Sequence, residues 1–194
     1  ETKPKGYTLQ LEEVLVTAQK REEDTMSVPI TVNAFTAQDM LNTGADNIQD
    51  IADFMPGVEI DNGGATQVGI SIRGIKSPNI SSGGDPSVAT FYDNAYMPRA
   101  ATSIPFTDIA RTEVLKGPQG TLFGRNTPAG IVKFDTVKPG RGDNYVRGSY
   151  GTYDTINLEA GIGGQLSDLV AVRVSGLYQG RSDWVDNIDN GPGD

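Results

Sequence analysis

The sequence predicts a mixed α+β domain with short helices, followed by antiparallel β-strands that are only part of a larger sheet. Two short stretches with helical periodicity lie among β-prone runs between residues 28 and 138. After residues 139–140, Pro-Gly, the pattern changes to three segments in which apolar and polar residues alternate. The 194 residues include 24 Gly and 11 Pro, which favours many turns, and the chain is long enough to bury one globular core.

The composition excludes several classes of function. The chain has no Cys and no His, which excludes disulfide bonds, thiolate nucleophiles, Ser-His-Asp catalysis and the commonest ligands of transition metals. We therefore expect no enzyme, no cofactor and no metal site. The net charge of −9 has the wrong sign for neutralising phosphates, so nucleic acid is not an expected partner. No stretch approaches the ~20 apolar residues of a membrane-spanning helix, so any contact with a bilayer would be made by β-strands.

The N-terminal part contains one isolated β-prone run. Residues 1–12 are polar and without pattern, so we expect a flexible tail there. Residues 14–18, Val-Leu-Val-Thr-Ala, follow as a short run whose charged flanks offer no partner strand. Two interpretations stay open: the run is the first strand of the domain, or it adds itself as a strand to the sheet edge of another protein.

Two helices are predicted between the first strands of the domain. Alternation over residues 28–34 predicts a strand with one buried face. Thr36 as N-cap and Gly44 as a left-handed exit predict a helix between them. Asp46, with Gln49 three residues later, predicts a capping box at the start of a second helix, which ends at the following Pro-Gly dipeptide.

The rest of the domain is predicted to be mainly strands. Residues 93–94, Asp-Asn, favour a tight hairpin, and residues 76–86, rich in Ser, Gly, Asn and Pro, predict an exposed loop suited to recognition. The predicted strands cover residues 58–60, 68–72, 88–92, 113–115 and 131–134.

The C-terminal part alternates with a period of two over residues 145–150, 156–162 and 170–178. Alternating segments of roughly ten residues are typical of outer-membrane barrel strands, and a soluble β-sandwich would show the same pattern. Three strands cannot close a barrel, and an open sheet edge cannot face lipid because each unpaired backbone group costs several kcal/mol there. We therefore expect a truncated chain or a missing partner chain.

Taken in order, several segments resemble the N-terminal plug domain of TonB-dependent outer-membrane receptors. Residues 13–18 are similar to the TonB box, residues 50–58 to the helix that runs into a Pro-Gly-Val strand start, and residues 72–74, Ile-Arg-Gly, to the plug turn. The most specific segment is Arg-Thr-Glu-Val-Leu-Lys-Gly-Pro-Gln-Gly-Thr-Leu-Phe-Gly at 111–124, which continues through 129–138. The resemblance implies an α+β plug domain with a mixed sheet and short helices, followed by antiparallel strands of a transmembrane β-barrel that is mostly absent from this chain.

The resemblance also implies a domain organisation. It assigns residues 1–12 to a flexible tail, 13–18 to the TonB box, 25–139 to the plug domain, 144–182 to the first barrel strands and 183–194 to the start of an extracellular loop.

The implied function is active transport across the Gram-negative outer membrane. The cargo would be a scarce large solute, with a ferric siderophore as the first choice, and TonB would supply energy by pulling on the N-terminal box in the periplasm. The implied partners are the C-terminal domain of TonB, the remainder of the barrel, a metal chelate or other solute, and outer-membrane lipid. The alternative is a stand-alone, plug-like periplasmic module that engages TonB or a ligand without transport.

The resemblance carries over residue roles at three places. TonB would bind by strand addition to Glu13, Val14, Leu15, Val16, Thr17 and Ala18. A latch between plug and barrel would use Arg73 and Arg111 with glutamates of the barrel wall; a local ion pair of Arg111 with Glu113 or a nearby aspartate is the alternative. Substrate would contact Lys76, Ser77, Asn79, Ser81, Ser82, Tyr96 and Arg99, unless these are only solvated turn residues.

Overall fold

The computed structural model describes residues 15–16, 23–24, 30–45, 47–62, 68–77, 79, 84–99, 107–141 and 143–182. The chain divides into two compact units. The first unit consists of Glu1–Ile104 and Arg111–Asp135, and the second of Pro105–Ala110 and Thr136–Asp194. In the described part of the chain, no helix combines the length and the apolar character needed to cross a membrane.

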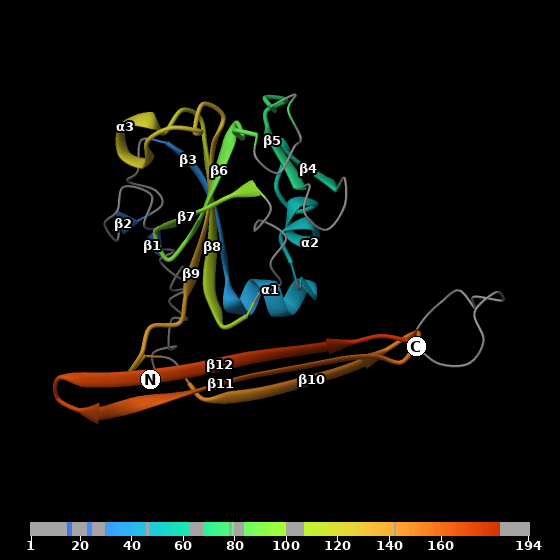
Figure 1. Ribbon diagram of the computed structural model, residues 1–194, viewed down its shortest axis with the longest axis vertical. Helices are drawn as coiled ribbons and strands as arrows, with labels where there is room; N and C mark the ends of the chain where they lie inside the picture. Colours follow the sequence, from blue (N-terminus) through green and yellow to red (C-terminus); the bar gives the residue numbers. More distant parts are fainter. Residues whose placement is uncertain are drawn as a thin grey trace, which may run out of the picture. The chain divides into compact units, whose positions relative to one another are not determined.

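A mixed five-stranded sheet is the centre of the first unit (Figure 1). Its strands are β3 (Thr31–Thr36), β8 (Ile109–Lys116), β9 (Gly130–Thr136), β6 (Val88–Tyr92) and β7 (Ala95–Met97), in that spatial order. The pairs β3–β8 and β6–β7 are antiparallel, whereas β6 and β9 run parallel. The mixed sheet with short helices that the sequence predicts is confirmed. The first residues of β8 belong to the second unit, so this strand passes from one unit into the other at Arg111.

Two short helices follow β3, and local capping explains both. Helix α1 (Ala37–Thr43) begins at the predicted N-cap Thr36 and ends at Gly44, which has the left-handed φ of 69°. Helix α2 (Ile48–Ala52) begins one residue later than predicted. The Asn47 side chain accepts the first free backbone N–H groups, and the Asp50 carboxylate accepts the N–H of Asn47 at 3.1 Å. The expected box of Asp46 and Gln49 is therefore wrong by one position; Asp46 itself lies outside the described residues.

A separate hairpin of β4 (Val58–Asn62) and β5 (Val68–Ile72) follows α2, and Figure 1 shows it beside that helix. Arg73 directly follows β5 and has a φ of 54°. Its N–H donates to the Gly57 carbonyl at 2.7 Å. This hydrogen bond joins the residue after β5 to the turn that precedes β4. The predicted Ile-Arg-Gly turn is thus a real turn of the fold.

The central sheet buries side chains on both faces. On one face a cluster of fully or nearly fully buried residues contains Val16, Ala89, Phe91, Leu115 and Ile131, with Phe123 of the short helix α3 (Gly120–Phe123) against it. On the other face the Thr112 hydroxyl donates to the Met40 sulfur of α1 at 3.6 Å. Strand alternation explains the division, because neighbouring residues of β8 point to opposite faces.

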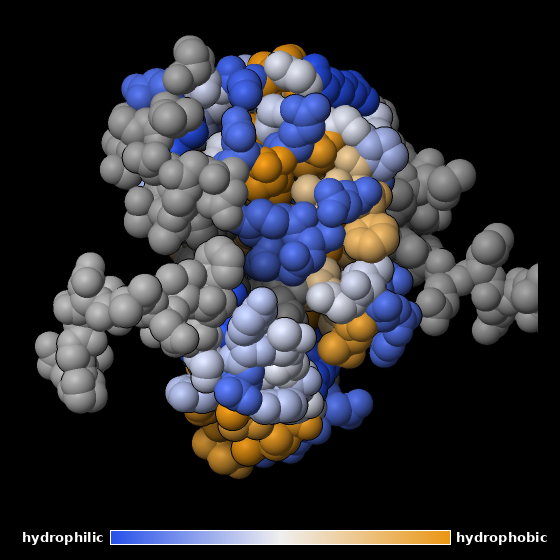
Figure 2. Space-filling model, turned by 90° about the vertical axis from the view of Figure 1, so that its right-hand side faces the viewer, coloured by the Kyte–Doolittle hydropathy of each residue, from blue (hydrophilic) through white to orange (hydrophobic). Residues whose placement is uncertain are grey.

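The second unit is a three-stranded antiparallel meander of β10 (Tyr145–Gly151), β11 (Thr155–Ser167) and β12 (Val170–Gly180). The register pairs even residues with even residues and odd with odd from Tyr145↔Gly161 to Gln165↔Ala171. One face therefore carries the even positions, and its large side chains are exposed. Figure 2 shows hydrophobic side chains gathered on one face of this sheet. The exposed apolar residues at even positions of these strands are Val146, Tyr150, Ile156, Leu158, Ile162, Leu166, Val170, Val172, Val174 and Tyr178.

Candidate functional site

The predicted TonB-binding segment contributes a short strand to the first unit. Strand β1 (Leu15–Val16) pairs antiparallel with β2 (Glu23–Asp24), in the register Leu15↔Asp24 and Val16↔Glu23. The expectation that its flanks offer no partner strand is therefore wrong. Glu23 and Asp24 of the charged flank supply the partner strand, because the hydrogen bonds between paired strands join main-chain groups, whatever the side chains are. Glu13, Val14, Thr17 and Ala18 lie outside the described residues.

Val16 has a clear structural role in the described part of this segment. Its side chain has 0% exposure and belongs to the cluster of Phe91, Leu115 and Ile131. Burying a Val side chain contributes about 1.5–3 kcal/mol relative to exposing it. Of the two interpretations of the segment, the structure shows the first: the segment forms a strand of the domain. Binding to TonB stays a prediction.

The predicted latch residue Arg111 lies in a network of buried charges on adjacent strands, which we call the β8–β9 network. Arg111 Nε contacts Glu113 Oε1 at 2.9 Å and Asp135 Oδ2 at 3.0 Å. Lys133 Nζ lies 2.6 Å from Asp135 Oδ1. The Glu113 side chain is fully buried and that of Lys133 nearly so. The local ion pair left open by the sequence is therefore present, and pairing with barrel glutamates stays a prediction.

Asp135 shows how the β8–β9 network stabilises its own charges. Burial raises the pKa of the Asp135 carboxyl, but hydrogen bonds and positive charge from Lys133 and Arg111 outweigh burial and lower the pKa below 3.8. A carboxyl group with a depressed folded-state pKa stabilises the fold above its unfolded-state pKa of about 3.9. This contribution is lost as the pH falls through the folded-state pKa.

Arg73, the other predicted latch residue, has different surroundings. It is exposed, and its Nη2 donates to the Thr31 hydroxyl at 3.3 Å. It also acts on the buried Lys116, whose Nζ donates to the Pro56 carbonyl at 2.6 Å. Burial, and then the charge of Arg73, lower the pKa of Lys116. The structure thus gives Arg73 and Arg111 separate environments.

The predicted substrate residues fall into an exposed group and a buried one. Lys76 pairs with Asp61 at 3.2 Å, and both side chains are largely exposed, so this pair contributes little to stability. Tyr96 is 42% exposed, and its hydroxyl accepts from Asn126 Nδ2 at 3.2 Å, which also donates to Asp85 at 3.0 Å. Asn79 is exposed and Ser77 half-buried, whereas Ser81 and Ser82 lie outside the described residues.

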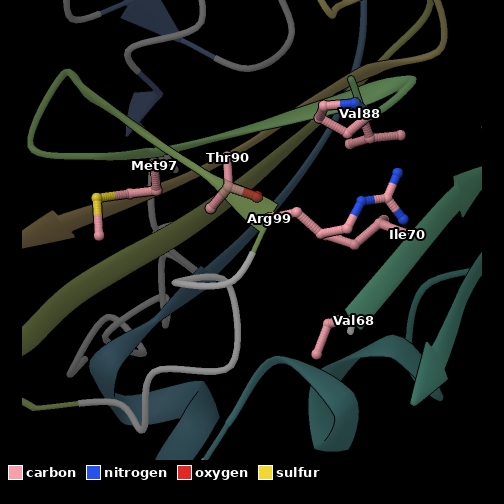
Figure 3. Close-up of a pocket in the computed structure, with 7 residues that line it drawn as sticks. Val68, Ile70, Val88, Thr90, Met97 and Arg99 are labelled. Carbon is pink, nitrogen blue, oxygen red and sulfur yellow. The ribbon is translucent and has the colours of Figure 1, made fainter. Parts of the chain in front are cut away.

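Arg99 belongs to the buried group, contrary to the expectation that it faces solvent. Only 5% of the residue is exposed. It lines a cavity of about 10 Å³, enough for one water molecule, together with Val68, Ile70, Pro86, Val88, Thr90 and Met97. Figure 3 shows its guanidinium group extending past Ile70 of β5. Its Nε is buried and has no hydrogen-bond partner within the described part of the chain.

Arg99→Met is expected to stabilise the first unit. A buried guanidinium group whose Nε lacks a hydrogen-bond partner costs free energy, and Met fills a similar volume without charge, so we expect a gain of about 1–3 kcal/mol. The midpoint of urea unfolding, followed by circular dichroism, measures the change. Arg99→Lys keeps the buried charge and is the matched control, for which no gain is expected. An Arg99→Met midpoint below that of the wild type would contradict the argument.

The second unit contains a polar centre that the sequence did not reveal. We call Asp108, Tyr145, Glu159 and Arg173 the Asp108 centre. Arg173 Nε and Nη2 donate to the two carboxylate oxygens of Asp108, each at 2.6 Å, and both side chains are 5% exposed. Glu159 accepts from the Asp108 N–H at 2.8 Å and from the Tyr145 hydroxyl. Arg147 lies 3.6 Å from Glu159 and 4.1 Å above the Tyr145 ring.

Part of this centre had a signal in the sequence. Tyr145, Glu159 and Arg173 are odd positions of the alternating segments, so they share the face opposite the apolar one. Their polar or aromatic character on that face pointed to a polar environment. Sequence alternation gives the face but not the register, and nothing local connects Asp108 with residues 37 to 65 positions further along the chain.

The part of the chain that the structure describes holds no group of three or more side chains suited to bind a metal ion. The candidate sites are therefore a short N-terminal strand, two networks of paired charges, and loop residues around Tyr96 and Arg99.

The comparisons with known proteins agree with this picture. The chain is 26% identical over 183 residues to the pesticin receptor of Yersinia pestis, which covers 92% of this chain and 26% of that protein. It is 28% identical over 131 residues to the vitamin B12 transporter BtuB of Vibrio vulnificus, covering 64% of this chain and 20% of the transporter. The chain thus spans about a quarter of the length of its first curated relatives.

Solved structures show the same fold. The ferric yersiniabactin uptake receptor FyuA from Yersinia pestis matches with a TM-score of 0.70 and 25% identity, over 76% of this chain and 24% of that chain. The pyoverdine outer membrane receptor FpvA from Pseudomonas aeruginosa PAO1 matches with a TM-score of 0.73 and 21% identity, over 89% of this chain and 25% of that chain. The sequence model of the family "TonB-dependent Receptor Plug Domain" covers residues 24–131. The chain therefore belongs to the TonB-dependent receptor plug domain family.

Proposed function

We propose that the chain is part of a Gram-negative outer-membrane receptor that transports a scarce large solute, with a ferric siderophore as the first choice. In this proposal residues 25–139 form the plug, residues 144–182 the first barrel strands, and TonB pulls on residues 13–18 from the periplasm. The family membership supports it, as do relatives that include a ferric yersiniabactin uptake receptor and a vitamin B12 transporter.

The observation that carries the proposal is the apolar face of the second unit. Even-numbered side chains of β10–β12 are exposed, with Val146 at 76% and Val174 at 74%. Exposing such a face to water costs about 25 cal/mol per Å², so it needs a cover. A stand-alone periplasmic module would have to bury it against its own domain. The exposure favours a lipid-facing barrel wall, which would continue in further strands.

The geometry of the N-terminal strand supports strand exchange as the way in which TonB engages the chain. Within the described residues the β1–β2 ladder consists of two residue pairs, a short set of main-chain hydrogen bonds. An added strand from TonB would replace them with main-chain bonds of the same kind. The burial of the Val16 side chain stabilises the segment in the resting domain, and this burial would be lost in the exchange.

Proline substitutions in this segment are expected to abolish energised uptake. Val14→Pro and Val16→Pro each remove an N–H donor and fix φ, which prevents a continuous added strand. Uptake of a radiolabelled ferric chelate by cells carrying the full-length receptor measures the effect, and binding at 0 °C reports the surface-exposed receptor. We expect uptake to fall to the level of a strain without TonB, while binding is retained.

Threonine substitutions are the matched controls. Val14→Thr and Val16→Thr keep β-branching and the N–H donor, so their effect on uptake should be mild. Val16→Thr adds one buried hydroxyl group, which costs about 1–3 kcal/mol if unpaired. Wild-type uptake by both proline variants would refute the role of the segment. A panel of ferric chelates, tested for growth of a deletion strain with and without the receptor, would identify the cargo.

A further inference from the structure

We propose that the Asp108 centre is a fixed anchor, which holds residues 107–110 on strands β10–β12 while the N-terminal segment is pulled. This inference rests on the proposed function, because it assigns the centre a role in a TonB-driven receptor. Residues 107–110 lead directly into the part of β8 that belongs to the first unit. An anchor there would fix one end of the central sheet.

Every polar group of Asp108 takes part in a hydrogen bond. Its carboxylate accepts two hydrogen bonds from Arg173, and its N–H donates to Glu159. Its carbonyl accepts from the Val137 N–H at 2.9 Å. The φ of Asp108 is 54°, a left-handed conformation that a non-Gly residue keeps only where its surroundings determine it. The residue is therefore fixed in both backbone and side chain.

The charges of the centre are balanced on the odd-numbered face of the sheet. Asp108 pairs with Arg173, and Glu159 pairs with Arg147. The Tyr145 ring lies near both guanidinium groups, at 4.1 Å from Arg147 and 5.9 Å from Arg173. Two-pronged bonds between a guanidinium and a carboxylate are among the strongest in proteins, and burial protects this pair from water. The centre is thus suited to resist separation.

Gly161 makes room for the Asp108–Arg173 pair. A Cβ atom at this position would lie 2.7 Å from Tyr145 Cε1, 2.8 Å from Arg173 Nη2 and 3.0 Å from Asp108 Oδ1. On the same strand, a Cβ at Gly164 would meet nothing within 4 Å. A methyl group at position 161 therefore disturbs the centre without changing any charge, and Gly164 offers a matched control.

The anchor and the N-terminal strand differ in how they resist a pull. In the described part of the chain, two residue pairs join β1 to β2. The Asp108 centre combines a buried two-pronged ion pair with two hydrogen bonds that Glu159 of β11 accepts, one from the Asp108 N–H and one from the Tyr145 hydroxyl of β10. A force applied at the N-terminus should therefore open the β1–β2 ladder first. The segment at 107–110 stays in place and limits how far the plug is displaced.

The test measures leakage through the full-length receptor in a strain that lacks TonB. The variants are Asp108→Asn, Arg173→Met and Gly161→Ala, with Gly164→Ala as control, and the readout is susceptibility to vancomycin, which the outer membrane normally excludes. A loosened anchor should lower the minimal inhibitory concentration several-fold for the three variants and leave the control at the wild-type value. The charge exchange Asp108→Arg with Arg173→Asp should restore part of the seal.

The outcomes separate the anchor from the proposed function. Wild-type susceptibility of all three variants at equal outer-membrane abundance would overturn the anchor, as would equal leakage from Gly164→Ala and Gly161→Ala. If the neutral variants do not reach the membrane, Arg173→Lys retains the charge without the two-pronged geometry. An intermediate leak then supports the anchor, and wild-type susceptibility overturns it. Loss of TonB-dependent uptake is measured in a different strain, so failure of the proposed function leaves this test unaffected.

Discussion

Gly130→Ala is expected to destabilise the first unit by about 3–5 kcal/mol, the range of the most disruptive single substitutions. A Cβ at Gly130 would lie 2.2 Å from the Leu115 carbonyl oxygen and 2.9 Å from Ile72 Cδ1. The first contact is with backbone of β8, which cannot move without breaking the sheet. Gly130 also has a φ of 148°, outside the range that L residues commonly adopt. Only glycine lets the start of β9 approach β8 so closely.

The midpoint of urea unfolding of the chain in detergent measures the effect. Gly74→Ala is the matched control, because Gly74 also has a positive φ, at 75°, but a Cβ there would meet nothing within 4 Å. This control should show only the conformational cost of about 1–2 kcal/mol. The difference between the two variants reports the clash with β8. Equal midpoints for the two would show that β9 has room to move.

The second large effect is expected from Lys133→Met, which should destabilise the chain by about 3–5 kcal/mol at pH 7. Lys133 is almost completely buried and lies 2.6 Å from the Asp135 carboxylate. Its removal takes one cation out of a network that holds the buried carboxylates of Glu113 and Asp135. A buried charge that has lost a partner is far more costly than a buried pair.

The pH dependence of unfolding distinguishes this charge effect from a packing effect. In the wild type, burial raises the pKa of Asp135, but Lys133 and Arg111 lower it by more. The net pKa is therefore lowered, and acid destabilises the fold. In Lys133→Met the main source of that lowering is gone, and burial should raise the pKa. Protonation of Asp135 at pH 4 should then make the variant's loss of unfolding free energy, relative to wild type, smaller than at pH 7. A loss that is the same at pH 7 and pH 4 would assign the effect to packing, which Lys133→Met combined with Asp135→Leu would test further.

The parts of the fold that the sequence predicts correctly depend on local signals. The N-cap at Thr36 and the left-handed exit at Gly44 need only residues within one helix. The error of one residue at α2 has a local cause as well, because both Asp46 and Asn47 are good N-cap residues with a suitable partner three positions later. Alternation predicts the two faces of β10–β12 because one face is apolar throughout.

The remaining features depend on contacts between distant residues. The β1–β2 pair was missed because Glu and Asp have low strand propensity, whereas a two-residue ladder needs only main-chain groups. Arg99 follows a short strand and reads as a surface residue until β5 and β6 enclose it. The Asp108 centre requires the strand register, which alternation alone does not give. The pairing of Asp108 with Arg173 is therefore the part of the site that sequence reasoning could not supply.

The continuity of β8 restricts how this stretch of sequence can evolve. Asp108 is fixed on one side of Arg111, and the continuously buried stretch 112–116 of the strand follows on the other. Inserting or deleting a single residue between these positions would exchange the two faces of the strand, bringing Glu113 to the side of Val114. Substitutions can accumulate here, but a change in length cannot. Among relatives, the spacing from this aspartate to the arginine should accordingly be invariant even where the intervening residues differ.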